Sequence, residues 1–109
     1  MRRGDVVSIA DRQGQLTSKP RPAVIVQSDF FVEANTVVIC PISFENVGAP
    51  LVRFQITPSE TLPLNRTSWI EADMITTIRR TRVGRLIGRI RDTDLVRLNG
   101  ALAVFLGLA

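Results

Sequence analysis

The sequence predicts a mainly β fold with short helices (α+β), in which a small barrel or strongly twisted sheet is followed by a C-terminal helix. Several short segments rich in β-branched residues occur at modest spacing, one segment alternates with period two, and the last segment has helical spacing. The length of 109 residues is typical of one domain, and no repeat, low-complexity tract or linker divides residues 1–109.

Three strands are predicted in the first half of the chain. Residues 5–10 form the first, and the compact apolar runs 23–26 and 37–42 indicate strands that are buried on both faces. The polar loop at 11–19 is long enough to carry function. Between the two buried strands, Ser28 is expected to cap a short helical turn over residues 28–34.

Three further strands are predicted in the second half. Residues 52–56 alternate with period two, which puts Arg53 and Gln55 on a solvated face. Residues 69–75 and 86–91 indicate two more strands, joined by an arginine-rich connection over residues 78–85.

The chain ends in a predicted helix that Asp92 or Thr93 caps and Gly107 terminates. Gly100 costs this helix about 1 kcal/mol relative to alanine, and we expect its missing side chain to let another element approach closely. Apolar residues follow helical spacing along one face, where we expect core and dimer contacts. They are Leu95, Leu98, Leu102, Phe105 and Leu106.

The composition limits the chemistry that the protein can use. The net charge is +4 and thirteen of the fourteen basic residues are arginine, which favours nucleic acid or an acidic protein as partner, although surface arginines also serve solubility. With no histidine and one cysteine, no zinc or transition-metal site is expected. Catalysis would therefore depend on carboxylates, hydroxyls, arginine or backbone dipoles.

The redox state and location of the protein follow from two further observations. Cys40 has no partner for an intramolecular disulfide, so a reducing cytoplasm is expected. The N-terminus lacks the apolar core of a signal peptide, and the apolar stretch 101–108 is too short to span a bilayer, so we expect no membrane association.

Four motifs in this order resemble the MazF/PemK toxin family. They are Arg-Gly-Asp-Val at 3–6, Arg-Pro-Ala-Val-Ile-Val-Gln at 21–27, Pro-Ile-Ser at 41–43 and Val-Phe-Leu-Gly-Leu at 104–108. Each motif alone is weak, but their order and spacing frame nearly the whole chain.

The resemblance implies an SH3-like barrel that forms a homodimer and binds single-stranded RNA in a cleft. It also implies a toxin of a type II toxin–antitoxin system, partnered by an antitoxin with an acidic C-terminal tail. The implied reaction is attack of the ribose 2′-hydroxyl on the adjacent phosphate. The products are a 2′,3′-cyclic phosphate and a 5′-hydroxyl, and no metal or other cofactor is needed.

Arg21 and Ser43 are the catalytic residues that the resemblance implies. Arg21 lies between two prolines, which favour an extended and stiff backbone, and we expect it to stabilise the developing phosphorane charge. Ser43 follows a predicted strand, where family members carry a hydroxyl that hydrogen-bonds the scissile phosphate. The alternatives are a surface salt bridge for Arg21 and a turn-forming role for Ser43.

Proton transfer is less clearly assigned by the sequence. Many relatives have an acidic residue in the loop before Arg21, whereas residues 15–19 contain no carboxylate. Some relatives also place an arginine where this chain has Glu71. Asp73 is our third catalytic candidate, and it and Glu71 either act as the base, orient Arg21, or pair with an arginine for structure alone.

Basic and aromatic residues are the candidates for RNA binding. We assign Phe44 to stacking on a base, with the alternative that it belongs to the core or a dimer interface. One tryptophan and no tyrosine indicate no wide aromatic platform. The predicted cationic contacts are Lys19, Arg53, Arg79, Arg80 and Arg82. Arg85, Arg89 and Arg91 are expected to line one side of the next strand.

Two other functions remain open. A toxin of the CcdB type shares the fold and poisons gyrase without cutting RNA, and the pairing of Arg21 with Ser43 argues against it. A catalytically inert homologue that binds only RNA or antitoxin is favoured by the missing loop carboxylate.

Overall fold

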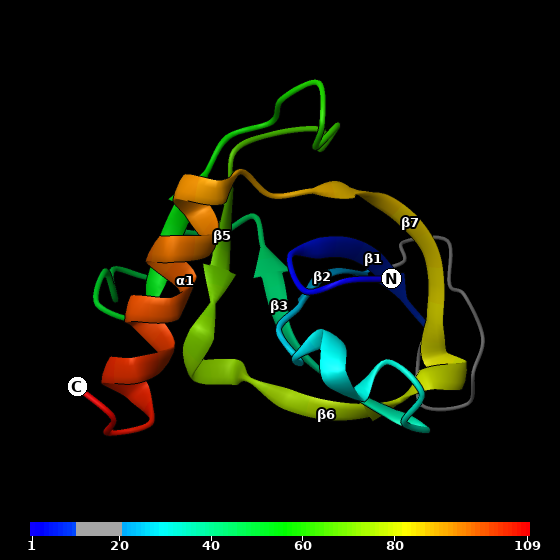
Figure 1. The fold of residues 1–109 in the computed structure, drawn as a ribbon. Coiled ribbons are helices and arrows are strands. Elements are labelled where there is room, and N and C mark those ends of the chain that lie inside the picture. The colour runs from blue at the N-terminus through cyan, green and yellow to red at the C-terminus, as the bar shows by residue number, and fades with distance from the viewer. Residues whose placement is uncertain (11–20) are drawn as a thin grey trace.

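The computed structural model describes residues 1–10 and 21–109, so the predicted loop 11–19 and the predicted RNA contact Lys19 lie outside the described residues. The described part of the chain forms a curled antiparallel sheet, three single-turn 3₁₀ helices and one C-terminal α-helix (Figure 1). The elements are β1 (Asp5–Ile9), β2 (Arg21–Ile25), η1 (Asp29–Phe31), β3 (Thr36–Ser43), β4 (Arg53–Ile56), β5 (Ser68–Glu71), η2 (Ala72–Met74), β6 (Thr76–Arg79), η3 (Arg80–Arg82), β7 (Val83–Arg89) and α1 (Asp92–Phe105).

The strand β3 organises the sheet, whose order is β4-β5-β3-β2-β1-β7. One edge of β3 pairs with β2, while its other edge pairs with β6 near Thr36 and with β5 near Ser43. β6 and β7 curve around the side of the sheet opposite α1, and η3 connects them (Figure 1). The predicted mainly β fold with a C-terminal helix is confirmed.

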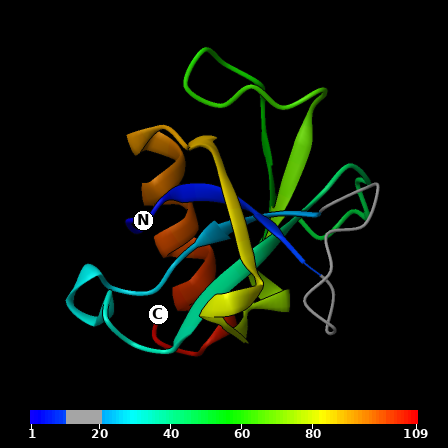
Figure 2. The same ribbon diagram turned by 90° about the vertical axis from the view of Figure 1, so that its right-hand side faces the viewer.

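Both faces of the central strands are buried, as the apolar runs predict. Alternate residues of β1, β2 and β3 point to two different cores, for example Val6 and Val24 to one and Val7 and Ile25 to the other. The first core is covered by α1, which contributes Leu98 among other side chains. Figure 2, turned so that β7 faces the viewer, shows β7 in front and α1 behind it.

The region after β5 differs from the prediction. The expected strand 69–75 ends at Glu71, and η2 turns the chain so that the separate strand β6 can pair with the start of β3. The arginine-rich connection 78–85 is the end of β6, the turn η3 and the beginning of β7. The sequence pattern does not reveal this turn, because the residues of η2 continue the alternation of apolar and acidic side chains that begins in β5.

The predicted stripe of Arg85, Arg89 and Arg91 along one side of a strand is wrong. The register of β7 against β1 shifts twice, so the side-chain alternation is interrupted between Arg85 and Arg89. Arg85 is exposed, while Arg89 donates to the carbonyl of Arg3 and to Asp5, and Arg91 follows the strand. The three side chains therefore do not form one cationic face.

The sequence predicts the end of the helix α1 correctly but not its N-terminal cap. Its N-cap is Arg91, which makes no side-chain capping bond, so the predicted cap at Asp92 or Thr93 is wrong. The end is confirmed: Gly107 has φ of +74°, and the amides of Gly107 and Leu108 bond back to Val104 and Ala103.

Of two expectations about the body of this helix, one is partly met and the other is wrong. Leu98 and Leu102 are buried, whereas Phe105 and Leu106 are about half exposed, at 46% and 51%. No other element of the described chain comes within 4 Å of a Cβ built on Gly100, so the expected close approach there is wrong.

Among the described residues, no helix is long and apolar enough to cross a membrane.

Candidate active site

A row of four side chains crosses the open face of the sheet. Ser43 of β3 pairs with Trp69 of β5, and Trp69 pairs with Gln55 of β4. On the other side, β2 pairs with β3 as far as Ala23 and Pro41, and Arg21 and Ser43 each lie two residues beyond that pair, at neighbouring ends of the two strands. Directly paired residues of antiparallel strands point to the same face, so we call Arg21, Ser43, Trp69 and Gln55 the central row.

The burial pattern confirms which face the central row occupies. Ile42 and Ile70, next to Ser43 and Trp69 in sequence, are 6% and 0% exposed in the core beneath α1. Arg21 and Gln55 are exposed, and Ser43 and Trp69 are partly exposed. The structure thus places the predicted residues Arg21 and Ser43 on one solvent-facing surface.

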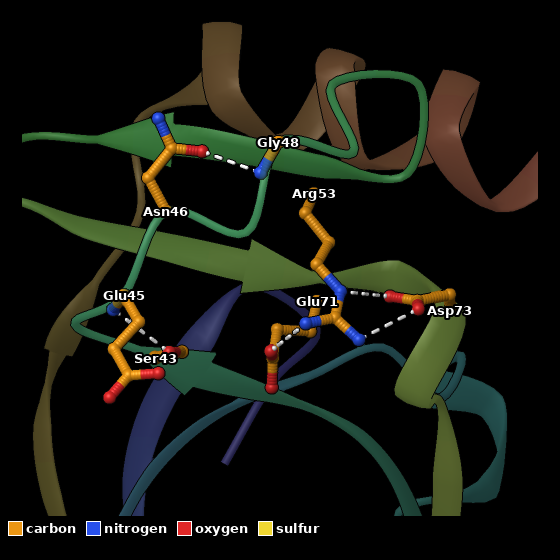
Figure 3. A network of polar contacts seen from close by, with 7 residues as sticks. All are labelled: Ser43, Glu45, Asn46, Gly48, Arg53, Glu71 and Asp73. Atoms are coloured by element: carbon orange, nitrogen blue, oxygen red, sulfur yellow. Dashed lines mark hydrogen bonds and ion pairs between the residues drawn. The ribbon is translucent and has the colours of Figure 1, made fainter.

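The Ser43 hydroxyl serves the turn that follows β3 and has a proton left to donate. Its Oγ accepts the backbone N–H of Glu45 at 3.0 Å, and Asn46 accepts from Gly48 one turn later (Figure 3). The turn-forming alternative is therefore correct as local structure. It is compatible with phosphate binding, because a hydroxyl can accept one hydrogen bond and donate another.

Arg53 binds two carboxylates beside the central row. Its Nε and Nη2 donate to the two oxygens of Asp73 at 2.8 and 2.9 Å, and its Nη1 donates to Glu71 at 2.7 Å (Figure 3). The side chains are 19% exposed for Arg53, 15% for Glu71 and 23% for Asp73. We call these three residues the ion-pair cluster, and the predicted role of both acids as partners of an arginine is confirmed for Arg53.

The ion-pair cluster determines the protonation of Asp73. The hydrogen bonds from Arg53 lower the pKa of Asp73, and the positive charge of Arg53 acts in the same direction against partial burial. The bond to Asp73 is also the main cause that raises the pKa of Arg53. Asp73 and Arg53 are therefore both ionised at neutral pH. The cluster holds two carboxyl groups against one guanidinium.

Two residues that the sequence analysis did not select lie beside predicted site residues, one beside Ser43 and one beside Phe44. The first is Trp69. Its position between Ser68 and Ile70, which are buried in a strand with period-two alternation, could have indicated that its side chain faces solvent. Arg66 is the other: its guanidinium carbon lies 4.4 Å from the ring centroid of Phe44, which is 38% exposed. The predicted stacking residue Phe44 is thus exposed and already paired with a cation.

The structure does not bring the arginines around η3 to the central row. Arg79 is exposed and pairs with Thr36, about 23 Å along β3 from Ser43. The Nε of Arg80 donates to the carbonyl of Ala34 at 2.7 Å, so this guanidinium fixes the chain near the start of β3.

Arg82 lies nearer to the strand that carries Arg21. Its Nε and Nη2 both donate to the carbonyl of Ala10, at 3.0 and 2.9 Å, and the preceding residue Ile9 is the register partner of Arg21. Within residues 1–10 and 21–109, no group of three His, Cys, Asp or Glu side chains is arranged to hold a metal ion.

Comparisons with known proteins identify the family of the chain. Residues 2–106 match the family described as "PemK-like, MazF-like toxin of type II toxin-antitoxin system". The probable endoribonuclease MazF of Mycolicibacterium smegmatis is 40% identical over 109 residues, which cover 100% of this chain and 99% of that protein. The chain belongs to the PemK-like, MazF-like family of type II toxins.

Solved structures of this family share the fold. A mycobacterial endoribonuclease in complex with its cognate antitoxin aligns with a TM-score of 0.78 at 24% identity, covering 100% of this chain and 97% of that one. A chain of the MazE–MazF crystal structure (Form II) from Deinococcus radiodurans aligns with a TM-score of 0.75 at 19% identity, covering 100% of this chain and 97% of that one.

Proposed function

We propose that this toxin is an endoribonuclease that cuts single-stranded RNA without a metal ion. The observation that carries the proposal is the placement of Arg21 and Ser43 at neighbouring ends of the adjacent strands β2 and β3, each two residues beyond the last pair that joins these strands and each open to solvent. A guanidinium and a hydroxyl at the spacing of neighbouring strands, about 5 Å, suit the oxygens of one phosphate. The relative from Mycolicibacterium smegmatis, named a probable endoribonuclease, supports the same activity.

In the proposed reaction the RNA supplies its own nucleophile. The 2′-hydroxyl loses its proton and attacks the adjacent phosphorus, and the bond from phosphorus to the 5′-oxygen breaks as that oxygen gains a proton. The products are a 2′,3′-cyclic phosphate and a 5′-hydroxyl. Arg21 stabilises the added negative charge of the phosphorane, and the Ser43 hydroxyl donates to a phosphate oxygen.

We propose a carboxylate of the ion-pair cluster as the group that accepts the proton. Asp73 is deprotonated, as a base must be, but both of its oxygens accept from Arg53 and its lowered pKa makes it a weak base. Glu71 uses one oxygen for Arg53 and lies two residues along β5 from Trp69, the register partner of Ser43. The pH dependence of the cleavage rate distinguishes Glu71 from Asp73. Changing the residue that acts as the base to its amide removes the fall in rate at acidic pH, whereas changing the other residue does not.

The proposed partners are a second copy of this chain and an antitoxin with an acidic tail, both acting in the cytoplasm. The net charge of +4 suits an acidic tail, and one of the similar structures is a complex with an antitoxin. The last turn of α1 leaves Phe105 and Leu106 about half exposed, which suits a dimer contact. Sedimentation equilibrium of the toxin alone tests the dimer, and a monomer would contradict it.

The test of the activity is incubation of the protein with a long unstructured RNA in EDTA, followed by end-group analysis. We expect cyclic phosphate and 5′-hydroxyl ends, and a rate about 10²- to 10³-fold lower for Arg21→Ala. Arg2→Ala is the matched control, because it removes the same charge from an exposed side chain outside the site. Intact RNA with the wild-type protein would contradict the proposal and favour the gyrase-poisoning or inert-binder functions.

A further inference from the structure

Trp69 occupies an unusual place for the single tryptophan of a small protein. Its sequence neighbours Ser68 and Ile70 are both 0% exposed and point into the molecule, whereas Trp69 lies on the opposite face and belongs to neither core cluster. Large aromatic rings usually contribute to the core, where they bury the most apolar area. Trp69 instead lies partly exposed on the open face, where part of its ring can meet solvent or a ligand.

The neighbours of Trp69 on that face are polar, and one of them, Ser43, is proposed to bind the phosphate. Ser43 is its register partner on one side and Gln55 is its partner on the other, each about 5 Å away at the backbone. The amide of Gln55 is exposed and can donate and accept at the same time. Its backbone carbonyl accepts from the Nη1 of Arg97 at 2.9 Å, which fixes the strand that presents it.

Charge separates the two ends of this surface. Arg21 provides positive charge at one end of the central row, whereas the ion-pair cluster next to Trp69 and Gln55 carries more carboxylate than guanidinium. A phosphate is therefore favoured at Arg21 and Ser43 and disfavoured over β4 and β5. An uncharged, flat group that is joined to the phosphate suits the space above Trp69.

We propose that Trp69 is the stacking surface for an RNA base that flanks the scissile phosphate, and that Gln55 binds the edge of this base. The inference rests on the proposed function, since it takes the phosphate position from Arg21 and Ser43. A base and its phosphate are separated by one ribose, so a nucleotide whose phosphate lies at Ser43 extends its base along the central row. Trp69 and Gln55 are therefore specificity-determining residues of the toxin.

The fluorescence of Trp69 gives a direct test, because the chain has one tryptophan and no tyrosine. The probe is a single-stranded RNA of mixed sequence with 2′-O-methyl riboses, which cannot be cut by 2′-hydroxyl attack. An oligomer with the same backbone and abasic residues is the comparison. We expect the base-bearing probe to quench Trp69 strongly on binding and the abasic oligomer to leave the emission nearly unchanged.

Variants test the same inference by affinity, measured as the anisotropy of a labelled probe. Trp69→Ala is expected to weaken binding of the base-bearing probe about 5- to 150-fold, and Trp69→Phe is expected to weaken it less, because phenylalanine still stacks. Phe30→Ala is the matched control, since Phe30 is 91% exposed on η1 and belongs to no proposed site. For Gln55→Leu we expect a changed preference among cleavage sites in a long RNA.

The outcomes separate this inference from the proposed nuclease activity. Equal quenching by both probes, or equal affinity of Trp69→Ala and wild type, would overturn the stacking role even if RNA is cut in an Arg21-dependent way. Base-dependent quenching together with weaker binding by Trp69→Ala would support the stacking role, even if the wild type leaves a cleavable RNA intact and so contradicts the nuclease.

Discussion

Among single side chains, Arg53 makes the most demanding set of contacts. It joins β4 to β5 and η2 by three charge-assisted hydrogen bonds in a partly buried setting. We expect Arg53→Ala to lower the free energy of unfolding by about 2 kcal/mol, between the values for exposed and buried pairs, because it leaves two carboxylates facing each other. Urea denaturation measures the change. An unaltered midpoint would show that the cluster does not stabilise the fold.

The same cluster predicts how stability depends on pH. Because the pKa of Asp73 is lowered from the ordinary value of 3.8, its contribution to stability is present above about pH 4. The contribution is lost as the pH falls below 3.8 through the lower pKa of the folded state. We expect Arg53→Lys, which keeps the charge without the forked geometry, to show a smaller loss over this range than the wild type. Free energies of unfolding measured at a series of acidic pH values test this, and parallel curves would contradict it.

Cys40 provides a prediction about reactivity. The residue is 0% exposed in the core beneath α1, and burial raises the pKa of its thiol to about 12. Since the thiolate is the nucleophile, we expect iodoacetamide at pH 8 to leave the folded protein unlabelled and to alkylate it in urea. Mass spectrometry of the two samples measures this. Rapid labelling without urea would mean that the core opens frequently.

At the scale of elements, we expect the substitution of glycine by alanine to have opposite effects on stability at Gly88 and at Gly100. A Cβ on Gly88 of β7 would lie 2.3 Å from the carbonyl oxygen of Thr61, which accepts the N–H of Arg89. Gly88→Ala must displace backbone, and we expect it to cost about 1–3 kcal/mol, as overpacking does. Gly100→Ala is the matched control, with an expected gain of up to about 1 kcal/mol because it removes a helical glycine beside open space. Melting temperatures that shift in the same direction would contradict this assignment.

The elements that the sequence predicts best are those with a strong local signal. The buried runs of β2 and β3, the solvated alternation of β4 and the Gly107 stop of α1 all appear where their patterns indicate. The failures share a cause: η2, η3 and the two register shifts of β7 depend on how the chain must turn to cover the second core. Tertiary packing decides such turns, and neither period two nor helical spacing encodes it.

At the scale of the molecule, the candidate site is a property of strand register. Arg21 and Ser43 were predicted from the resemblance, because each lies in a motif of adjacent residues. The row that adds Trp69 and Gln55 needs the pairing of β3 with β5 and of β5 with β4, which join positions far apart in the sequence. Arg53 was predicted to lie on a solvated face and to contact RNA. Its guanidinium instead donates to Glu71 and Asp73, because the turn η2 brings Asp73 next to Arg53.

The distribution of positive charge over the molecule predicts how RNA binding depends on salt. Arg80, Arg82 and Arg89 donate to carbonyl oxygens of their own chain, so fewer cations meet a phosphodiester than the composition implies. Each phosphate contact adds about −0.7 to the slope of log affinity against log salt for single strands. We expect Arg21→Ala to reduce this slope by about 0.7 and Arg82→Ala to leave the slope unchanged while lowering the melting temperature. Anisotropy titrations of the 2′-O-methyl probe at several KCl concentrations measure the slopes. An equal reduction in both variants would show that Arg82 leaves Ala10 to bind phosphate, as the sequence analysis predicted.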